Sequence, residues 1–336
     1  FPAYKEDKVI IPAIYSFLQQ DYPRELYDII VISDQMQEST NEALRQLPVR
    51  LLIADYTDSS KAKAMSLAMN ATADIPYDAV VIMDADNTAG TSFLSELNPV
   101  FQSGARAVQA HRTAKNTNTD IAVLDAASEE INNSIFRSGH IALGLSSALI
   151  GSGMALEACW FRQHIHLLET AGEDKEMEAL LLKQRIHIEY LEHVYVKDEK
   201  TQKKEGIKNQ RKRWIAAQFD SLVRTLPDFP KELLRGNIDY CDKVFQWTLL
   251  PRIILIFCTF FFTILVTLVS PYSSIKWWIL AFALFLALFT AIPGHLLNKQ
   301  LLRAIFQLPS LLLGIASNLF KLKGVNKKFI HTEHGN

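Results

Sequence analysis

Residues 79–86 have the sequence AVVIMDAD, in which five apolar residues stand directly before the carboxylates of Asp84 and Asp86. Such a run is typical of a strand that is buried on both faces, and the acidic residues mark the loop after it. Apolar runs of similar length occupy residues 27–33, 49–54 and 105–110, and residues 59–73 and 119–140 have helical composition. This alternation predicts βαβ units, a mainly parallel sheet and a nucleotide-binding α/β domain.

Acidic residues also follow two other predicted strands. Asp34 follows the apolar residues 29–32, and Glu6 follows the opening segment 1–4. The carboxyl ends of parallel strands meet at one sheet edge, where ligands bind, so these acids favour nucleotide recognition. Asp84 and Asp86 offer the oxygen ligands that Mg²⁺ prefers on a bound diphosphate. The alternative is that residues 84–88 form only a turn or a helix cap.

The composition describes a chain with two different parts. It has 336 residues, a net charge of −1 and 49% hydrophobic residues, but Leu, Ile and Phe dominate beyond about residue 250. The N-terminal half therefore resembles a soluble protein, and the last part suits an apolar solvent. Cys159, Cys241 and Cys258 have no spacing typical of a zinc site or a disulfide framework, in keeping with a reducing cytosol. Because the chain begins with Phe1 and not Met, we expect a truncated amino end.

Two long uncharged segments predict a transmembrane hairpin. Residues 253–275 and 277–298 contain no Asp, Glu, Lys or Arg, and Pro271 and Lys276 mark the turn between them. Each segment is long enough to cross the hydrocarbon layer, although a buried core helix is the alternative. Residues 304–320 are apolar but contain Gln307, Pro309 and Asn318, which favours an interfacial helix over a third crossing.

Basic residues flank the hairpin on one side of the expected membrane. They are Arg211, Lys212, Arg213, Arg235 and Arg252 before it, and Lys299, Arg303, Lys321, Lys323, Lys327 and Lys328 after it. By the positive-inside rule the soluble part and the C-terminus face the cytoplasm, and residues 270–274 face the other side. We therefore expect a multi-pass protein of the inner (cytoplasmic) membrane, with lipid as a partner. The basic stretch 197–213 has no interleaved aromatic residues, so no nucleic-acid partner is expected.

Several motifs occur in a characteristic order along nearly the whole chain. They are Pro2-Ala3-Tyr4-Lys5-Glu6, Asp34, Lys61, Asp84-Ala85-Asp86, Gly172-Glu173-Asp174 and Gln210-Arg211-Lys212-Arg213-Trp214. This order resembles that of inverting, membrane-integrated family 2 glycosyltransferases, which include the cellulose, hyaluronan and poly-N-acetylglucosamine synthases. The Gln-x-x-Arg-Trp element before membrane segments is the most specific of these motifs.

The resemblance implies an α/β fold of GT-A type, with a Rossmann-like mixed sheet followed by interfacial and transmembrane helices. It divides the chain into four parts. Residues 1–196 would form the cytoplasmic GT-A catalytic domain, and residues 197–250 a basic segment with interfacial helices. Residues 251–298 would form the transmembrane hairpin, and residues 299–336 an interfacial helix and a cytoplasmic tail.

The resemblance also implies a donor site for a nucleotide diphosphate sugar, with UDP as the expected carrier. Its expected residues are Tyr4, Glu6, Asp34, Lys61, Asp84, Gln210 and Arg213. Glu6 and Asp34 would contact the uridine, and the Arg213 guanidinium would bind the diphosphate. Asp84 and Asp86 would hold Mg²⁺ or Mn²⁺. A solvated helix face is the alternative for Lys61.

The acceptor site implied by the resemblance comprises Gly151, Ser152, Glu173 and Trp214, with Asp174 as the general base. Inverting transfer needs a carboxylate that takes the proton of the acceptor hydroxyl while its oxygen attacks the anomeric carbon. Two alternatives stay open: residues 151–153 suit a plain turn, and the acids suit the first turn of a helix that runs to about residue 184. Gly172 stands where many relatives have Thr.

The resemblance thus predicts a metal-dependent enzyme that transfers a sugar from a nucleotide diphosphate sugar to a glycan or lipid-linked acceptor. Synthesis of a cell-surface polysaccharide is the expected setting. A transferase that adds a single sugar to a glycolipid is one alternative. A catalytically silent nucleotide-sugar-binding protein that regulates a synthase is another.

Overall fold

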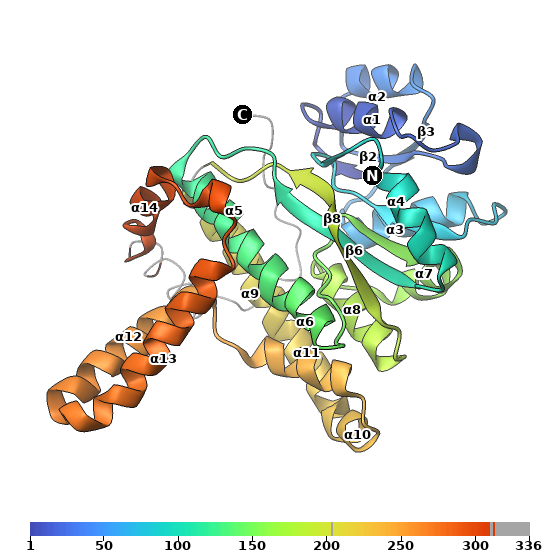
Figure 1. Ribbon diagram of the computed structural model, residues 1–336. Coiled ribbons are helices and arrows are strands. Elements are labelled where there is room, and N and C mark those ends of the chain that lie inside the picture. The colour runs from blue at the N-terminus through green and yellow to red at the C-terminus, as the bar shows by residue number, and fades with distance from the viewer. Residues whose placement is uncertain (203, 310–311, 313–336) are drawn as a thin grey trace.

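The computed structural model describes residues 1–202, 204–309 and 312, and its strands form two sheets (Figure 1). The first sheet is parallel throughout, in the order β1 (Pro2–Tyr4), β2 (Ile30–Asp34) and β3 (Arg50–Ala54). The second has the order β4 (Ala79–Ile82), β7 (Met154–Glu157), β6 (Ala107–Ala114), β8 (Ile188–Asp198) and β5 (Thr88–Ala89). In this sheet β6 and β8 are parallel, and the other pairs are antiparallel.

All four predicted strands are present, although their ends differ from the prediction. The run 27–33 becomes β2 only from Ile30, and the run 105–110 continues as β6 to Ala114. The expectation of a mainly parallel sheet is wrong for the second sheet, in which β5 and β7 pair antiparallel with their neighbours. Both strands are short, so neither forms the long apolar run by which a strand is recognised in the sequence. The mixed sheet expected from the family resemblance is confirmed.

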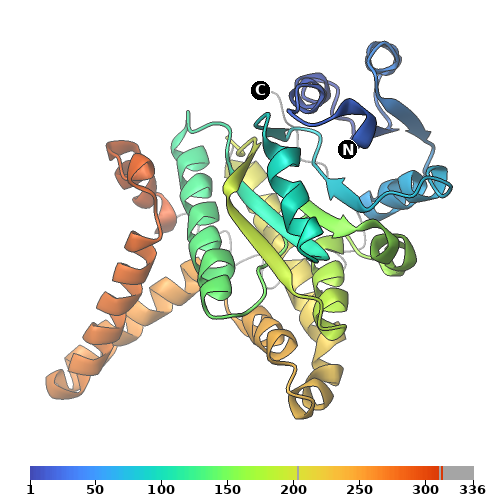
Figure 2. The same ribbon diagram turned by 45° about the vertical axis from the view of Figure 1, so that its right-hand side comes forward.

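Helices cover both sheets (Figures 1 and 2). The first group is α1 (Ile10–Leu18), α2 (Glu38–Arg45), α3 (Lys61–Ala71) and α4 (Phe93–Gln102). The second group is α5 (Asp120–Asn133), α6 (Gly139–Ala142), α7 (Ala158–His164) and α8 (Glu173–Lys183). The third group is α9 (Lys204–Thr225), α10 (Phe229–Leu234), α11 (Ile238–Thr248), α12 (Arg252–Val269), α13 (Pro271–Thr290) and α14 (Lys299–Ile305).

Capping side chains set the start of the two helices that the composition predicts. The Ser60 hydroxyl accepts the Lys63 N–H at 3.2 Å before α3, and the Thr119 hydroxyl accepts the Ala122 N–H at 3.1 Å before α5. The predicted helix 119–140 is not one regular helix, since α5 passes into a π-helical turn at Ser134–Ser138 before α6.

The second sheet has a hydrophobic core on each face. Side chains alternate along β7, so Met154 and Leu156 join the cluster of Leu181 and Trp160, whereas Ala155 joins the cluster of Phe93 on the opposite face. All six are at most 3% exposed. Packing on both faces holds the second sheet in place. The acidic loop with Asp84 and Asp86 follows the end of β4 in this sheet.

Helices α12 and α13 form a hairpin that projects from the globular part (Figures 1 and 2). Among the described residues these are the two helices long and apolar enough to cross a membrane. Their side chains are mostly exposed, and the buried ones, Thr263, Ser274 and Ala281, are small. Helices of 18 and 20 residues span roughly 27 and 30 Å, close to the thickness of a hydrocarbon layer.

The hairpin differs from the prediction in its turn and its end. The chain reverses at Ser270, and Lys276 lies inside α13 and not in the connection. Pro271 explains this turn, because proline suits the first position of a helix and disfavours a helical residue before it. α13 ends at Thr290, so the predicted second segment to residue 298 is too long. Most of the predicted interfacial helix 304–320 lies outside the described residues.

Candidate active site

The parallel register of the first sheet brings Tyr4 and Asp34 together. They are paired at the ends of β1 and β2, and the Lys5 N–H donates to the Asp34 carbonyl at 3.1 Å. The Asp34 side chain is 3% exposed, and its Oδ1 accepts no hydrogen bond from the described residues. Burial raises the pKa of this carboxyl. The Ser59 hydroxyl and the Lys5 ammonium oppose this rise. A buried carboxylate oxygen at this sheet edge suits the N–H or hydroxyl group of a bound ligand. Glu6 lies just beyond, where its carbonyl accepts the N–H groups of Val9 and Ile10 at the start of α1.

Lys61 connects this edge to the acidic loop after β4. It begins α3, and its ammonium lies 2.5 Å from Asp84 Oδ1, 2.7 Å from the Gly151 carbonyl and 3.7 Å from Glu173 Oε1. The side chain is only 14% exposed, which excludes the solvated helix face considered from the sequence. Three segments far apart in the sequence thus converge on one cation.

Gly151 lies beside Lys61 and the first turn of α8. Its φ of +80° favours glycine, whereas a β-carbon there would make only ordinary contacts, 3.7 Å from Lys61 Nζ and 3.8 Å from Asp174 Cβ. The neighbouring Ser152 is fully buried, and its hydroxyl lies 3.4 Å from Arg112 Nη1. Residues 151–153 are therefore a turn that also borders the acidic residues.

Glu173 and Asp174 begin α8, as expected of acids that complement a helix dipole. Glu173 is 7% exposed, and burial raises its pKa to about 7, against the opposing charge of Lys61. Asp174 is more accessible, and its Oδ1 accepts the Lys175 N–H at 2.9 Å. The two neighbouring acids thus differ in environment: one is enclosed with a cation and the other borders solvent.

Asp86 is buried against the end of β8. Its Oδ1 accepts from the Asn87 amide at 3.1 Å, and its Oδ2 accepts the Glu199 N–H at 2.8 Å. The β5–β8 ladder pairs Thr88 with Lys197, and two more residues in this antiparallel register bring Asp86 opposite Glu199. The sequence contains no signal for this contact, because the donor is a backbone N–H brought near by sheet pairing.

Helix α9 brings part of the Gln-x-x-Arg-Trp element to the acidic loop. Burial lowers the pKa of Arg213, and the nearby charges of Glu173 and Asp84 oppose that shift. Gln210 Oε1 is buried and accepts no hydrogen bond from the described residues. The Trp214 ring instead lies 4.8 Å from the Arg211 guanidinium. Of this element, Arg213 is the residue whose electrostatic partners are the site acids.

Gly172 and Ala217 form a close helix contact that residue patterns cannot indicate. A β-carbon on Gly172 would lie 2.7 Å from Ala217 Cβ. Ala217 is three residues beyond Trp214 on α9, and Gly172 directly precedes Glu173. The glycine therefore lets α9 lie against the loop that presents the two acids, which accounts for glycine at this position.

The charge and chemistry of the Asp84–Asp86 loop fit a hard divalent cation that is also bound by phosphates. Two carboxylates follow the apolar strand β4, of which only Ile82 is fully buried, and Mg²⁺ or Mn²⁺ commonly takes one or two carboxylates together with phosphate oxygens and water. Among the described residues, no group of three or more His, Cys, Asp or Glu side chains could form a complete protein site.

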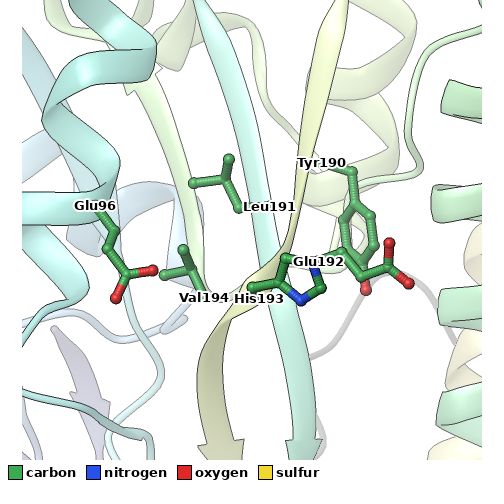
Figure 3. A pocket seen from close by; sticks show the side chains of 6 residues that line it. All are labelled: Glu96, Tyr190, Leu191, Glu192, His193 and Val194. Atoms are coloured by element: carbon green, nitrogen blue, oxygen red, sulfur yellow. The ribbon is translucent and has the colours of Figure 1, made fainter.

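An open pocket of about 460 Å³ lies elsewhere, between α4 and β8 (Figure 3). It coincides with an irregularity of β8: Ala110 pairs with Leu191, but the next residue, His111, pairs with Tyr195. The residues that line this pocket are Glu96, Tyr190, Leu191, Glu192, His193 and Val194. None of them belongs to the predicted site.

Comparison with solved structures identifies the fold. The mannosyltransferase PcManGT from Pyrobaculum calidifontis, in complex with GDP-Man and Mn²⁺, has a TM-score of 0.53 at 16% identity, and the match covers 95% of this chain and 86% of that chain. S. aureus TarS 1–349 has a TM-score of 0.47 at 12% identity, with 96% and 88% coverage. In complex with UDP, TarS 1–349 has a TM-score of 0.42 at 13% identity, and the chain spans 58% of its length. The molecule has the GT-A fold of nucleotide-sugar transferases.

The family follows from the sequence match. A model described as glycosyltransferase like family 2 matches residues 1–217, which is more than half of the chain. The chain belongs to this glycosyltransferase-like family. Curated protein sequences include no match.

Proposed function

We propose that this protein is an inverting, metal-dependent glycosyltransferase that uses a nucleotide diphosphate sugar, with a UDP-sugar as the expected donor. One observation carries this proposal. The Lys61 ammonium lies between the carboxylates of Asp84 and Glu173, and the charge of Arg213 interacts with the same two acids. Cations and paired acids at one sheet edge suit a diphosphate and the metal that accompanies it.

In the proposed donor site, Tyr4, Glu6 and Asp34 hold the nucleoside and Lys61, Gln210 and Arg213 hold the diphosphate. Asp34 would accept a hydrogen bond from the base through its buried Oδ1. Asp84 and Asp86 would hold Mg²⁺ or Mn²⁺, which neutralises the charge of the departing diphosphate. The PcManGT complex with GDP-Man and Mn²⁺ supports this pairing of a donor with a metal in the same fold.

Asp174 is the proposed general base. Its carboxylate takes the proton of the acceptor hydroxyl, whose oxygen forms the bond to the anomeric carbon while the bond to the diphosphate oxygen breaks on the opposite face. The Arg213 guanidinium stabilises the negative charge that develops on the leaving group. Gly151, Ser152, Glu173 and Trp214 would border the acceptor, with Glu173 held by Lys61.

We further propose that α12 and α13 cross the inner membrane as a hairpin, and that the acceptor is a growing glycan or lipid-linked sugar at the cytoplasmic surface. The exposed Leu, Ile and Phe side chains of both helices support insertion in lipid. α10 and α11 also expose apolar side chains, including Leu234 and Ile238, which suits helices in the interface. Synthesis of a cell-surface polysaccharide is the proposed setting.

A donor screen tests this function. The full chain, reconstituted in lipid nanodiscs, would be incubated with UDP-sugars and GDP-mannose, with and without Mg²⁺ or Mn²⁺, and nucleotide diphosphate release would be measured. We expect release from one donor, dependent on the metal and abolished in Asp86→Ala. Release that persists in EDTA would contradict the metal-dependent mechanism, and release from none of the donors would contradict the proposed activity. Mass spectrometry of the product then separates a polymerase from a transferase that adds one sugar.

A further inference from the structure

Helix α5 carries an unusual set of buried charges close to the proposed metal site. Glu129 is 4% exposed and contacts three cations: Arg112 Nη2 at 3.0 Å, Arg137 Nη1 at 3.2 Å and Lys200 Nζ at 3.8 Å. Burial alone would raise the pKa of Glu129, but these three cations together lower it well below its usual range. Glu129 is therefore the anionic centre of a buried ionic network.

The same network fixes residues 198–200, which we call the β8 exit. Asp198 forms ion pairs with two cations: its Oδ1 lies 2.8 Å from Lys200 Nζ, and its Oδ2 lies 3.5 Å from Arg112 Nε. Lys200 is 3% exposed, and Asn116 holds its backbone: Asn116 Oδ1 accepts the Lys200 N–H at 2.7 Å, and Asn116 Nδ2 donates to the Lys200 carbonyl at 3.2 Å. Two separate sets of contacts thus hold the β8 exit in one position.

The β8 exit in turn contacts the acidic loop. The N–H group of Glu199, which lies between Asp198 and Lys200, donates to Asp86 Oδ2 at 2.8 Å. Since Asn87 donates to Oδ1, both carboxylate oxygens have a fixed donor.

A buried ionic network is weak evidence for stability, because apolar side chains of similar volume often stabilise a protein as well or better. Its geometric consequence is different, because charged partners and directed hydrogen bonds hold atoms at defined positions. The network positions the Glu199 N–H, which donates to Asp86, a proposed metal ligand. This relation suggests a role in metal binding.

We infer that Glu129 and Asn116 are positioning residues for the metal: they hold the β8 exit so that the Glu199 N–H orients the Asp86 carboxylate toward the cation. This inference rests on the proposed function, in which Asp86 is a metal ligand. Hydrogen-bond partners of metal ligands typically change metal affinity 10- to 100-fold when they are lost. Glu129 and Asn116 act one contact further away, so we expect the lower end of that range.

Direct Mn²⁺ binding tests the inference without turnover. The full chain in nanodiscs would be titrated with Mn²⁺ at saturating UDP, and free Mn²⁺ would be followed by its electron paramagnetic resonance signal. Asn116→Ala removes both hydrogen bonds to Lys200 without leaving a buried charge, and we expect about a tenfold higher Kd for Mn²⁺. Asn116→Asp keeps the acceptor for the Lys200 N–H and should restore part of the affinity. Glu129→Gln should weaken Mn²⁺ binding at least as much as Asn116→Ala.

Glu130→Gln is the matched control. Glu130 is also buried on α5, but its hydrogen bonds are to His111, Thr113 and Asn133, and in the described part of the chain it forms no ion pair or hydrogen bond with the β8 exit. Its substitution should lower the melting temperature and leave the Kd for Mn²⁺ unchanged. The Kd for UDP without metal should stay the same in every variant, because the inference concerns the cation alone.

The outcomes separate this inference from the proposed function. If the wild-type chain binds neither UDP nor Mn²⁺ with UDP, the proposed function itself fails. If the wild type binds both and Asn116→Ala binds Mn²⁺ equally well, the inference is wrong and the network has only a structural role. Asn116→Ala decides this point even if Glu129→Gln does not fold.

Discussion

Helix α5 and the α12–α13 hairpin place their side chains in opposite ways. In α5, ten of 14 residues are buried, and these include Asp125, Glu129, Glu130 and Asn133. In the hairpin only Thr263, Ser274 and Ala281 are buried, whereas Phe and Leu side chains face outward. A charged side chain can be buried when partners surround it, whereas the described residues leave many apolar side chains of the hairpin exposed. The two regions are therefore adapted to different solvents.

The two regions also meet. At the root of the hairpin, Arg252 donates to the Ser128 carbonyl at 3.4 Å and to the Asn132 side chain of α5. Leu301 of α14, after the hairpin, packs against Val123 and Ala127 of the same helix. α5 therefore contacts both the hairpin root and the ionic network beside Asp86. Substitutions in the globular region should change turnover, and substitutions in the hairpin should change membrane insertion, so each set serves as a control for the other.

The largest expected effect is on the chemistry of the globular region. Asp174→Asn leaves the helix start intact but removes the proposed proton acceptor, and we expect turnover to fall about a thousandfold. Nucleotide diphosphate release in nanodiscs measures the loss, and the Kd for UDP should stay unchanged. Asp228→Asn, which alters a surface ion pair with Lys183, is the control and should keep wild-type turnover. Full activity of Asp174→Asn would exclude Asp174 as the base.

A smaller effect is expected in the hairpin. Phe261 lies halfway along α12 and is 62% exposed. Phe261→Lys should weaken membrane insertion by about 3 kcal/mol, because a lysine at the centre of a spanning helix is costly. The fraction of protein that resists alkaline extraction from membranes should fall, while the purified protein in detergent keeps its affinity for UDP.

Leu143→Lys is the matched control, since Leu143 is 78% exposed but lies in the globular region. It should leave membrane extraction unchanged. If Phe261→Lys is extracted no more readily than Leu143→Lys, the hairpin does not lie in lipid, and its apolar surface belongs to a protein interface.

Patterns that are local in the sequence predicted much of this molecule. The apolar run before Asp84 predicted β4 and its acidic loop, because a buried strand and its exit are determined by adjacent residues. The uncharged segments predicted the helices of the hairpin for the same reason. The proximity of Lys61, Asp84, Glu173 and Arg213 followed from the family resemblance and not from any local pattern.

Contacts between distant segments could not be predicted. β7 and β8 depend on partners far along the chain, and the four-residue step of β8 at His111 has no local signal. The contact of the Glu199 N–H with Asp86 uses a backbone group, so no residue type marks it. The sequence marks the turn by both Pro271 and Lys276, but the backbone preference of proline determines where α13 begins, and Lys276 lies inside that helix.

The contact of Gly172 with Ala217 provides a third, smaller test within the globular region. Gly172→Ala places a β-carbon 2.7 Å from Ala217 Cβ, so we expect a loss of about 1–3 kcal/mol in the free energy of unfolding. Ala217→Gly opens the contact but weakens α9 by about 1 kcal/mol. In the double variant the losses should not add, and urea unfolding measures this coupling. Strict additivity would show that the two residues do not constrain each other.

The smallest expected effect concerns Glu173, whose burial raises its pKa to about 7 from an ordinary value of 4.5. A raised pKa means that the neutral carboxyl stabilises the fold at low pH and that this contribution is lost as the pH rises through 7. Glu173→Gln stays neutral, so the melting temperature of the wild type should fall relative to this variant by about 3 °C between pH 5.5 and 8.

Glu232→Gln is the control, because hydrogen bonds from Asn237 and Arg235 lower the pKa of Glu232 and neither partner titrates in this window. Glu232 is thus ionised throughout, and its difference from the wild type should be constant. If the melting temperatures of Glu173→Gln and the wild type also differ by a constant amount, Lys61 keeps Glu173 ionised. Glu173 and Asp174 would then differ in their position and not in their charge.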